Sequence, residues 1–233
     1  MNVPTFLDRK KLVGTYSILN SYRNCPHQMG RRYVVKDLGP YVETPEIAWG
    51  NKVHLAMEQR VQGGKPLPVE MQGWEVFAAP LAAHEAGVRC ELKLGVTQDF
   101  LPCDFWAEDV WFRGKLDVAM IKGPNAYIVD WKTGKSTYED PLELETGAAL
   151  LRAKFSHIEK ITGNYVWLKE NRLGERYDLS DTRQTWSTVQ RLMDEIAAKV
   201  KSTDPVWDVW EKQPSGLCSW CPVKDCEHWR ERK

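Results

Sequence analysis

Two strand-like segments joined by a short turn most limit how this 233-residue chain can fold. In "WFRGKLDVAMIKGPNAYIVDWKTGK" the turn residues Lys-Gly-Pro-Asn, 122–125, favour a four-residue hairpin connection. If Ile121 pairs with Ala126, Asp117 lies directly opposite Asp130. The alternation then predicts an apolar face made of Leu116, Val118, Met120, Tyr127, Val129 and Trp131. The other face would carry Lys115, Asp117, Asp130 and Lys132.

The two opposed acids indicate a cation site. Opposed Cβ atoms lie roughly 5 Å apart, and two carboxylates at that range repel by about 3 kcal/mol if the effective dielectric constant is about 20. A divalent cation removes this repulsion, because Mg²⁺ binds carboxylate oxygens and keeps water ligands for chemistry. Lys132, on the same face, can orient or deprotonate a water or offset charge on a phosphate. The alternative, a pair of solvated strand ends, stays open because the register is inferred.

The order of the elements predicts the fold class. Helical spacing indicates helices over 17–33, interrupted at Pro26, and over 47–61, 71–86, 142–161 and 182–201. Strands are indicated over 88–94, 110–121, 126–132 and 164–169. Helices before and after a central group of strands predict a mixed α/β fold.

Composition sets limits on class and partners. An apolar content of 42% can fill the core of one sizeable domain. With 32 basic and 32 acidic residues there is no global positive field, so any phosphate-binding surface must be local. The sequence shows no secretion signal and no apolar run of membrane-spanning length. We therefore predict a cytoplasmic protein, in the host cytoplasm if the protein is viral, without a membrane partner.

The cysteines indicate a metal site. Cys218, Cys221 and Cys226 lie close together in "LCSWCPVKDC", and Cys25 is the best candidate for a fourth ligand. The tail, residues 204–233, is too short to hold a core without such a link. Zn²⁺ held by four cysteines, or by three cysteines with His27 or His228, and unligated structural thiols are open alternatives.

Four segments resemble one enzyme family. "GKLDVA" and "IVDWKTGK" resemble the Gly-x-x-Asp and Asp-Tyr-Lys-Thr-Gly segments of the RecB-like branch of the PD-(D/E)XK nuclease superfamily. "GNKVHLAME" resembles the family's Gly-x-x-x-His helix, and "CELKLG" resembles the strand that carries an upstream glutamate. The resemblance implies a restriction-endonuclease-like mixed central sheet flanked by helices, with residues 1–233 as a single nuclease domain.

The resemblance also implies roles for individual residues. His54, Asp117 and Asp130 would bind Mg²⁺ or Mn²⁺, Lys132 would be the catalytic lysine, and Glu91 would be a supporting acid. The reaction would be hydrolysis of DNA phosphodiester bonds by an exonuclease acting on single-stranded DNA or accessible ends. Protein partners in recombination, repair or CRISPR adaptation would fit. For His54 and Glu91 the alternatives are an ordinary helical histidine and a charge on a half-buried strand.

The cysteine segments resemble an iron-sulfur subgroup of the same family. "SILNSYRNCPHQMGRRY" and "LCSWCPVKDC" are similar to the first and last segments of CRISPR-associated and helicase-associated exonucleases. The resemblance implies a [4Fe-4S] cluster held by Cys25, Cys218, Cys221 and Cys226 that joins the N- and C-terminal segments. Residues 204–233 would pack with the Cys25 segment. A second functional class stays open: a catalytically silent nucleic-acid-binding or assembly module with the same fold and cluster.

Overall fold

The computed structural model describes residues 12–40, 42–84, 87–135, 139–202 and 209–231. The chain divides into two compact units. Residues Val42–Trp186 form the first, here called the sheet unit. The second, the cysteine unit, combines Met1–Tyr41 with Ser187–Lys233. That the whole chain acts as one nuclease domain stays a prediction. Within the described ranges no helix is long and apolar enough to cross a membrane.

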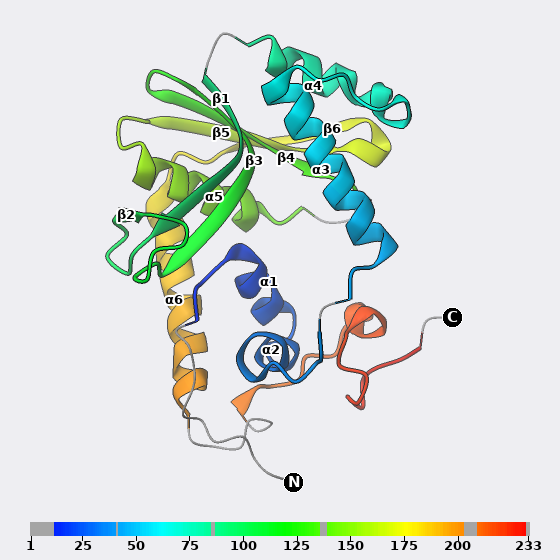
Figure 1. The fold of residues 1–233 in the computed structure, drawn as a ribbon. Helices are drawn as coiled ribbons and strands as arrows, with labels where there is room; N and C mark the ends of the chain where they lie inside the picture. The colour runs from blue at the N-terminus through cyan, green and yellow to red at the C-terminus, as the bar shows by residue number, and fades with distance from the viewer. Residues whose placement is uncertain (1–11, 41, 85–86, 136–138, 203–208, 232–233) are drawn as a thin grey trace. The chain divides into compact units, whose positions relative to one another are not determined.

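The sheet unit is built on one six-stranded mixed sheet with the strand order β2-β1-β3-β4-β5-β6 (Figure 1). β4 and β5 are parallel and the other neighbours are antiparallel. This confirms the predicted mixed α/β fold. The strands are β1 (Gly87–Val96), β2 (Pro102–Cys103), β3 (Phe112–Lys122), β4 (Asn125–Lys132), β5 (Lys160–Trp167) and β6 (Arg172–Asp178).

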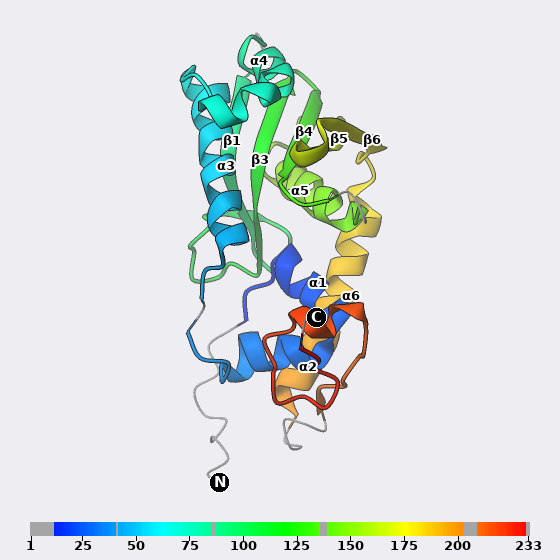
Figure 2. The same ribbon diagram turned by 90° about the vertical axis from the view of Figure 1, so that its right-hand side faces the viewer.

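Helices cover both faces of this sheet. α3 (Pro45–Gly63) lies on one side and α5 (Pro141–Lys154) on the other (Figure 2). α4 (Glu75–Ala82) packs on the α3 side, where buried residues of both helices share one core cluster with Val118 and Val129. Short 3-10 turns, η3 (Val69–Trp74) and η4 (Leu168–Glu170), complete the unit.

Local capping explains where the two main helices begin. Thr44 accepts a hydrogen bond from the backbone nitrogen of Ile47 at the start of α3, and Asp140 accepts one from that of Leu142 at the start of α5. α5 ends at Lys154, so the prediction of a helix to residue 161 is wrong. Residues 160–167 instead form a strand parallel to β4, a long-range pairing that helical spacing does not reveal.

The hairpin register is confirmed where the strands pair. Ile121 pairs with Ala126, and the pairing continues to Val118 and Val129. It ends there, one residue before the two acids. The carboxylate of Asp117 instead accepts a hydrogen bond from the backbone nitrogen of Trp131, at 2.9 Å. The prediction placed Asp117 opposite Asp130 in a continuous strand pairing. In the structure the Asp117 side chain instead bonds to the backbone of β4.

The predicted apolar face is wrong for Leu116. Val118 lies in the core cluster with residues of α3, whereas Leu116 faces α5, where a Cβ at Gly147 would overlap its side chain. The alternation therefore changes between these two residues. Glu91 lies beside this point on β1, between the pairs Cys90–Val118 and Leu92–Leu116, and has a φ of 52°. A local irregularity of this kind redirects side chains, as a β-bulge does.

The contact of α5 with the sheet predicts a large effect at Gly147. We expect Gly147→Ala to lower the free energy of unfolding by about 1–3 kcal/mol, because the new methyl group overlaps Leu116. Gly63→Ala, on α3 with open space around it, is the matched control and should be neutral or slightly stabilising. Chemical denaturation of both variants checks this. Equal stability of Gly147→Ala and wild type would contradict the packing.

The cysteine unit joins two distant chain segments. α1 (Tyr16–Asn24) ends at Cys25, α2 (Pro26–Met29) follows, and a π-helical turn, η2 (Gly30–Val35), continues it. The predicted break at Pro26 is confirmed. α6 (Thr182–Lys201) matches its predicted range, and the unit boundary falls within it. η5 (Gly216–Trp220) lies in the tail, whose residues 203–208 are outside the described ranges.

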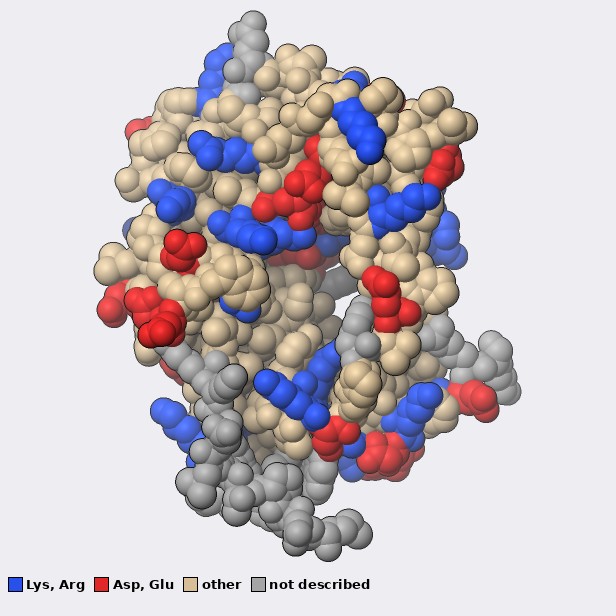
Figure 3. Space-filling model, in the orientation of Figure 1, with Lys and Arg blue, Asp and Glu red and all other residues tan. Residues whose placement is uncertain are grey.

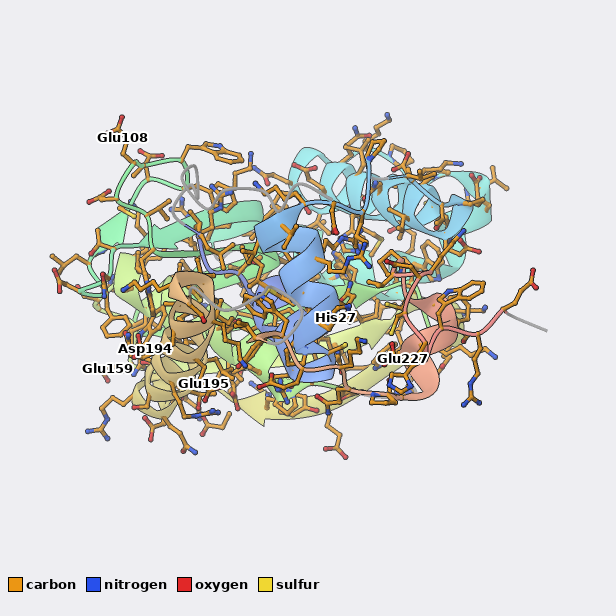
Figure 4. The ribbon with its side chains drawn as sticks, turned by 90° about the horizontal axis from the view of Figure 1, so that it is seen from below. His27, Glu108, Glu159, Asp194, Glu195 and Glu227 are labelled. Carbon is orange, nitrogen blue, oxygen red and sulfur yellow. The ribbon has the colours of Figure 1, made fainter. Side chains whose placement is uncertain are left out.

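Contacts tie the N-terminal helices to the tail. The backbone nitrogen of His27 donates to the carbonyl of Glu211 at 3.0 Å, and Gly30 packs so closely on Trp210 that an added Cβ would lie 2.6 Å from the ring. Figure 4 labels His27 on the helical segment and Glu227 on the tail. Arg31 forms an ion pair with Asp225.

Candidate active site

Three side chains from three elements of the sheet unit converge. His54 of α3, Glu91 of β1 and Asp117 of β3 each offer a ligand atom, and these atoms all lie within 4.8 Å of one another. In the parts of the chain that the structure describes, this is the one group of three or more His, Cys, Asp or Glu side chains so arranged. Acidic and basic side chains lie next to one another over the sheet beside α3 (Figure 3).

Asp117 organises this group. It is buried, its Oδ2 accepts from the nitrogen of Trp131, and its Oδ1 lies 3.2 Å from Nδ1 of His54. His54 lies one helical turn after Gly50, and Gly50 lies against Thr133 just beyond β4. The face of α3 that carries His54 therefore lies against the end of β4.

Glu91 is held in an unusual backbone conformation. Its φ of 52° lies in the left-handed region, which is uncommon for a residue other than glycine. Its carboxylate forms an ion pair with Lys115. Strained residues persist where the surroundings determine them and cluster at functional sites, which fits the position of Glu91 beside Asp117.

Lys132 is at the centre of a second group, on the α5 side. Its ammonium nitrogen lies 2.8 Å from Oδ2 of Asp130 and 2.6 Å from Oε2 of Glu143. It also lies 5.1 Å from the centre of the Tyr165 ring. Asp130 is thus placed with Lys132, outside the three-residue group of His54, Glu91 and Asp117. Its role as a cation ligand stays a prediction.

Electrostatics couple the two groups. Burial raises the pKa of Asp130 above its ordinary value, the charges of Asp117 and Glu143 raise it further, and Lys132 only partly offsets this. Burial lowers the pKa of Lys132, but Asp130 and Glu143 outweigh it, so the net shift is upward. Burial likewise lowers the pKa of His54, and the hydrogen bond and charge of Asp117 turn the net shift upward. Lys132 is therefore a cation at neutral pH.

Glu143 is the residue that sequence reasoning missed. It lies in "LELETGAALLRAKF", a segment outside the motifs that resemble the family. The sequence signal for Glu143 was its place in the first turn of the helix that follows the lysine segment, where an acid is favoured. That it reaches Lys132 depends on how α5 packs on the sheet, which local sequence does not specify.

The comparisons with known proteins identify the family. A family model described as the PD-(D/E)XK nuclease superfamily matches residues 72–226, which include Glu91, Asp117, Asp130 and Lys132. The chain belongs to the PD-(D/E)XK nuclease superfamily. No curated protein matches it.

Two solved structures share the superfamily fold with this chain. The crystal structure of SSO0001 is 15% identical, with a TM-score of 0.54, and the match covers 96% of this chain and 90% of that one. A protein from Eubacterium rectale named as a putative exonuclease is 11% identical, with a TM-score of 0.56 and coverage of 100% and 94%. At these identities the likeness concerns the fold.

The four predicted cysteine ligands line one cavity in the cysteine unit. The cavity, of about 260 Å³, is bordered by Cys25, Cys218, Cys221 and Cys226, and also by His27 and His228. None of the four forms a disulfide. Burial raises the pKa of Cys221, and the other three thiols add to the shift. The four side chains are thus neighbours, and their ligand role stays a prediction.

Proposed function

We propose that this member of the PD-(D/E)XK superfamily is a metal-dependent deoxyribonuclease that uses Mg²⁺ or Mn²⁺ and acts as an exonuclease. The observation that carries the proposal is the convergence of His54, Glu91 and Asp117 in a nuclease fold. Asp130 interacts electrostatically with His54 and Asp117 and pairs with Lys132. Binding of single-stranded DNA or DNA ends rests on the motif resemblance. The similarity to a protein named as a putative exonuclease supports it.

The donor set fits a divalent cation. Two carboxylates and one imidazole lie within 4.8 Å of one another, and carboxylates suit Mg²⁺ and Mn²⁺. The imidazole of His54 favours Mn²⁺ over Mg²⁺, because nitrogen ligands suit transition metals better than Mg²⁺. Asp117 is already oriented, since its Oδ2 is fixed by the backbone of Trp131. Such a cation, when bound, supplies positive charge beside the phosphate and activates water.

Lys132 would act on the phosphate through its charge. Its raised pKa makes the Lys132 ammonium group a hydrogen-bond donor. Asp130 and Glu143 hold the ammonium group at the end of β4, where it can orient the attacking water or stabilise charge that develops on the phosphate. In the proposal Asp130 is a further cation ligand. Cation binding would then be coupled to the position of Lys132, because Oδ2 of Asp130 lies 2.8 Å from the Lys132 ammonium nitrogen.

We also propose that a [4Fe-4S] cluster is held by Cys25, Cys218, Cys221 and Cys226. Four thiols around one cavity are the donor set that such clusters require. Zn²⁺ is the alternative, with His27 or His228 within the same cavity wall. The cluster would be structural, because it would link α1 and α2 to the tail across about 190 residues of chain.

Cation dependence is the first test of the proposed function. We expect end-labelled DNA to be degraded with Mn²⁺ or Mg²⁺ and not in EDTA, with a lower concentration needed for half-maximal rate with Mn²⁺. Asp117→Asn should lower the rate by about 10²–10³-fold, because the group loses a charged ligand. Asp99→Asn, which removes an exposed acid of the same unit, should leave the rate unchanged.

The proposal has a clear contrary outcome. If wild type degrades no DNA with either cation, or if Asp117→Asn is as active as wild type, this site is not a nuclease centre. Titration of Mn²⁺ binding by calorimetry gives a second readout that does not depend on turnover, and Asp117→Asn should weaken it.

A further inference from the structure

A cationic cavity lies at the other end of β4, near the turn of the β3–β4 hairpin. It has a volume of about 290 Å³ and is bordered by Lys122, Lys160 and Arg176 together with polar and aromatic side chains. Its described lining includes no Asp or Glu. The motifs of the candidate active site do not include any of these three cations.

The sheet register explains why the cations gather there. Lys122 of β3 pairs with Asn125 of β4, and Asn125 pairs with Lys160 of β5. Paired residues point to the same face, so both lysines stand beside Asn125, about 10 Å apart at two strand spacings. Arg176 pairs with Asn164, which lies four residues after Lys160 on the same face of β5. Three strands thus bring their cations to one face of the sheet.

Arg176 is held in place by neighbouring side chains. Its guanidinium donates to the hydroxyl of Thr162 at 3.0 Å and lies 5.8 Å from the centre of the Tyr127 ring. Thr162 is buried, and the Tyr127 hydroxyl donates to buried Asn164 at 2.8 Å. The guanidinium is therefore oriented before any ligand arrives, which lowers the entropy lost on binding.

The positive charge of this cavity is not neutralised within the described part of the chain. There, no ion pair involves Lys122, Lys160 or Arg176. Asp178 is one acid that interacts electrostatically with Lys160, and its carboxylate accepts a hydrogen bond from the backbone nitrogen of Ser180 at 3.0 Å. Three cations, one of them a preset guanidinium, are the chemistry that binds phosphate.

We propose that this cavity binds a backbone phosphate of the nucleic-acid substrate, away from the scissile bond. Tyr127 and Lys132 are five residues apart on β4, about 16 Å at roughly 3.3 Å per residue, and this odd spacing points their side chains to opposite faces of the sheet. A single strand that reaches both therefore covers at least about five nucleotides at roughly 3.4 Å each. The choice of nucleic acid as the ligand of this cavity rests on the proposed nuclease function. Because phosphate contacts carry no base information, the cavity would add affinity for every sequence and make binding depend on length.

Binding without cleavage tests the cavity. The variant Lys160→Gln/Arg176→Gln is compared with Lys154→Gln/Arg183→Gln, which removes two exposed cations outside the cavity. Labelled single strands of about 4 and about 12 nucleotides are titrated in EDTA by fluorescence anisotropy. We expect the cavity variant to bind the longer strand about 5–10-fold more weakly, with a salt dependence lower by about 0.7 for each lost phosphate contact. The shorter strand and the control variant should behave as in the wild type.

The outcomes separate this proposal from the proposed function. If wild type cleaves DNA and the cavity variant matches it in affinity and salt dependence, the cavity proposal is wrong and the nuclease proposal stands. If wild type neither binds nor cleaves DNA, both are wrong. Inorganic phosphate or a mononucleotide that binds wild type as tightly as the longer strand would show a site for free phosphate and overturn the assignment. Lys122→Gln, which leaves the Thr162 contact intact, replaces the double variant if that variant is unstable.

Discussion

Replacing Lys132 by alanine is expected to lower the rate of DNA hydrolysis by about 10³-fold while leaving DNA affinity nearly unchanged. The reason is the position of its ammonium group, which lies between Asp130 and Glu143 and is the cation nearest the end of β4. A charge that stabilises the reacting phosphate contributes in the transition state and little to ground-state binding. Single-turnover cleavage of end-labelled DNA at saturating Mn²⁺ measures the rate, and binding in EDTA measures the affinity.

Controls separate a catalytic from a structural loss. Lys135→Ala removes an exposed lysine three residues later and should keep full activity. Glu143→Gln keeps the ammonium but removes one of its two partners, so we expect about a tenfold lower rate. Thermal melting shows whether Lys132→Ala, which leaves Asp130 and Glu143 without their cation, still folds. A folded Lys132→Ala variant with more than a tenth of the wild-type rate would contradict the assigned role.

Replacing Cys221 by serine is expected to remove the proposed metal cluster and to destabilise the cysteine unit. Cys221 lies in the cavity with the other three thiols and interacts with each of them. A link across about 190 residues stabilises by roughly 5 kcal/mol in the chain-entropy treatment of cross-links, so its loss should lower the melting temperature by many degrees. Iron and zinc analysis and visible absorbance of anaerobically purified protein give the cluster content, and calorimetry gives the melting temperature.

The matched control is Cys103→Ser, because Cys103 lies on β2 and outside the cavity. It should keep the metal content and the melting temperature of wild type. Colourless wild-type protein with one zinc per chain would favour the zinc alternative. Wild type with neither metal would contradict the site, and cluster-free protein that melts no earlier than loaded protein would contradict a structural role.

Local sequence patterns predicted the hairpin but not where the side chains of Asp117 and Asp130 point. Turn residues and two-residue alternation determine the register, and the pairing of Ile121 with Ala126 is confirmed. The change of face between Leu116 and Val118 was not predictable, because it accompanies a glutamate with positive φ on the neighbouring strand. A positive φ is uncommon for a glutamate, so residue propensity argues against such an irregularity at this position.

The remaining features could not be predicted from local sequence because they depend on contacts between distant parts of the chain. The end of α5 and the start of β5 were misplaced because residues 155–161 contain apolar positions that suit either element. Glu143 joins the site only because α5 packs across the sheet next to Lys132. The spacing of the three C-terminal cysteines indicated a metal site. Cys25 was the best candidate for a fourth ligand, and the resemblance then implied the same residue, although no periodicity connects positions so far apart.

The two-segment composition of the cysteine unit has a consequence for biosynthesis. The sheet unit is one continuous stretch, Val42–Trp186, whereas the cavity needs Cys25 and three cysteines that follow residue 217. During synthesis from the N-terminus, the sheet can therefore form while those three thiols are still missing. Cys25 stays without the other three cysteines until nearly all of this sequence has left the ribosome, so loading of the proposed cluster would be a late, post-translational step.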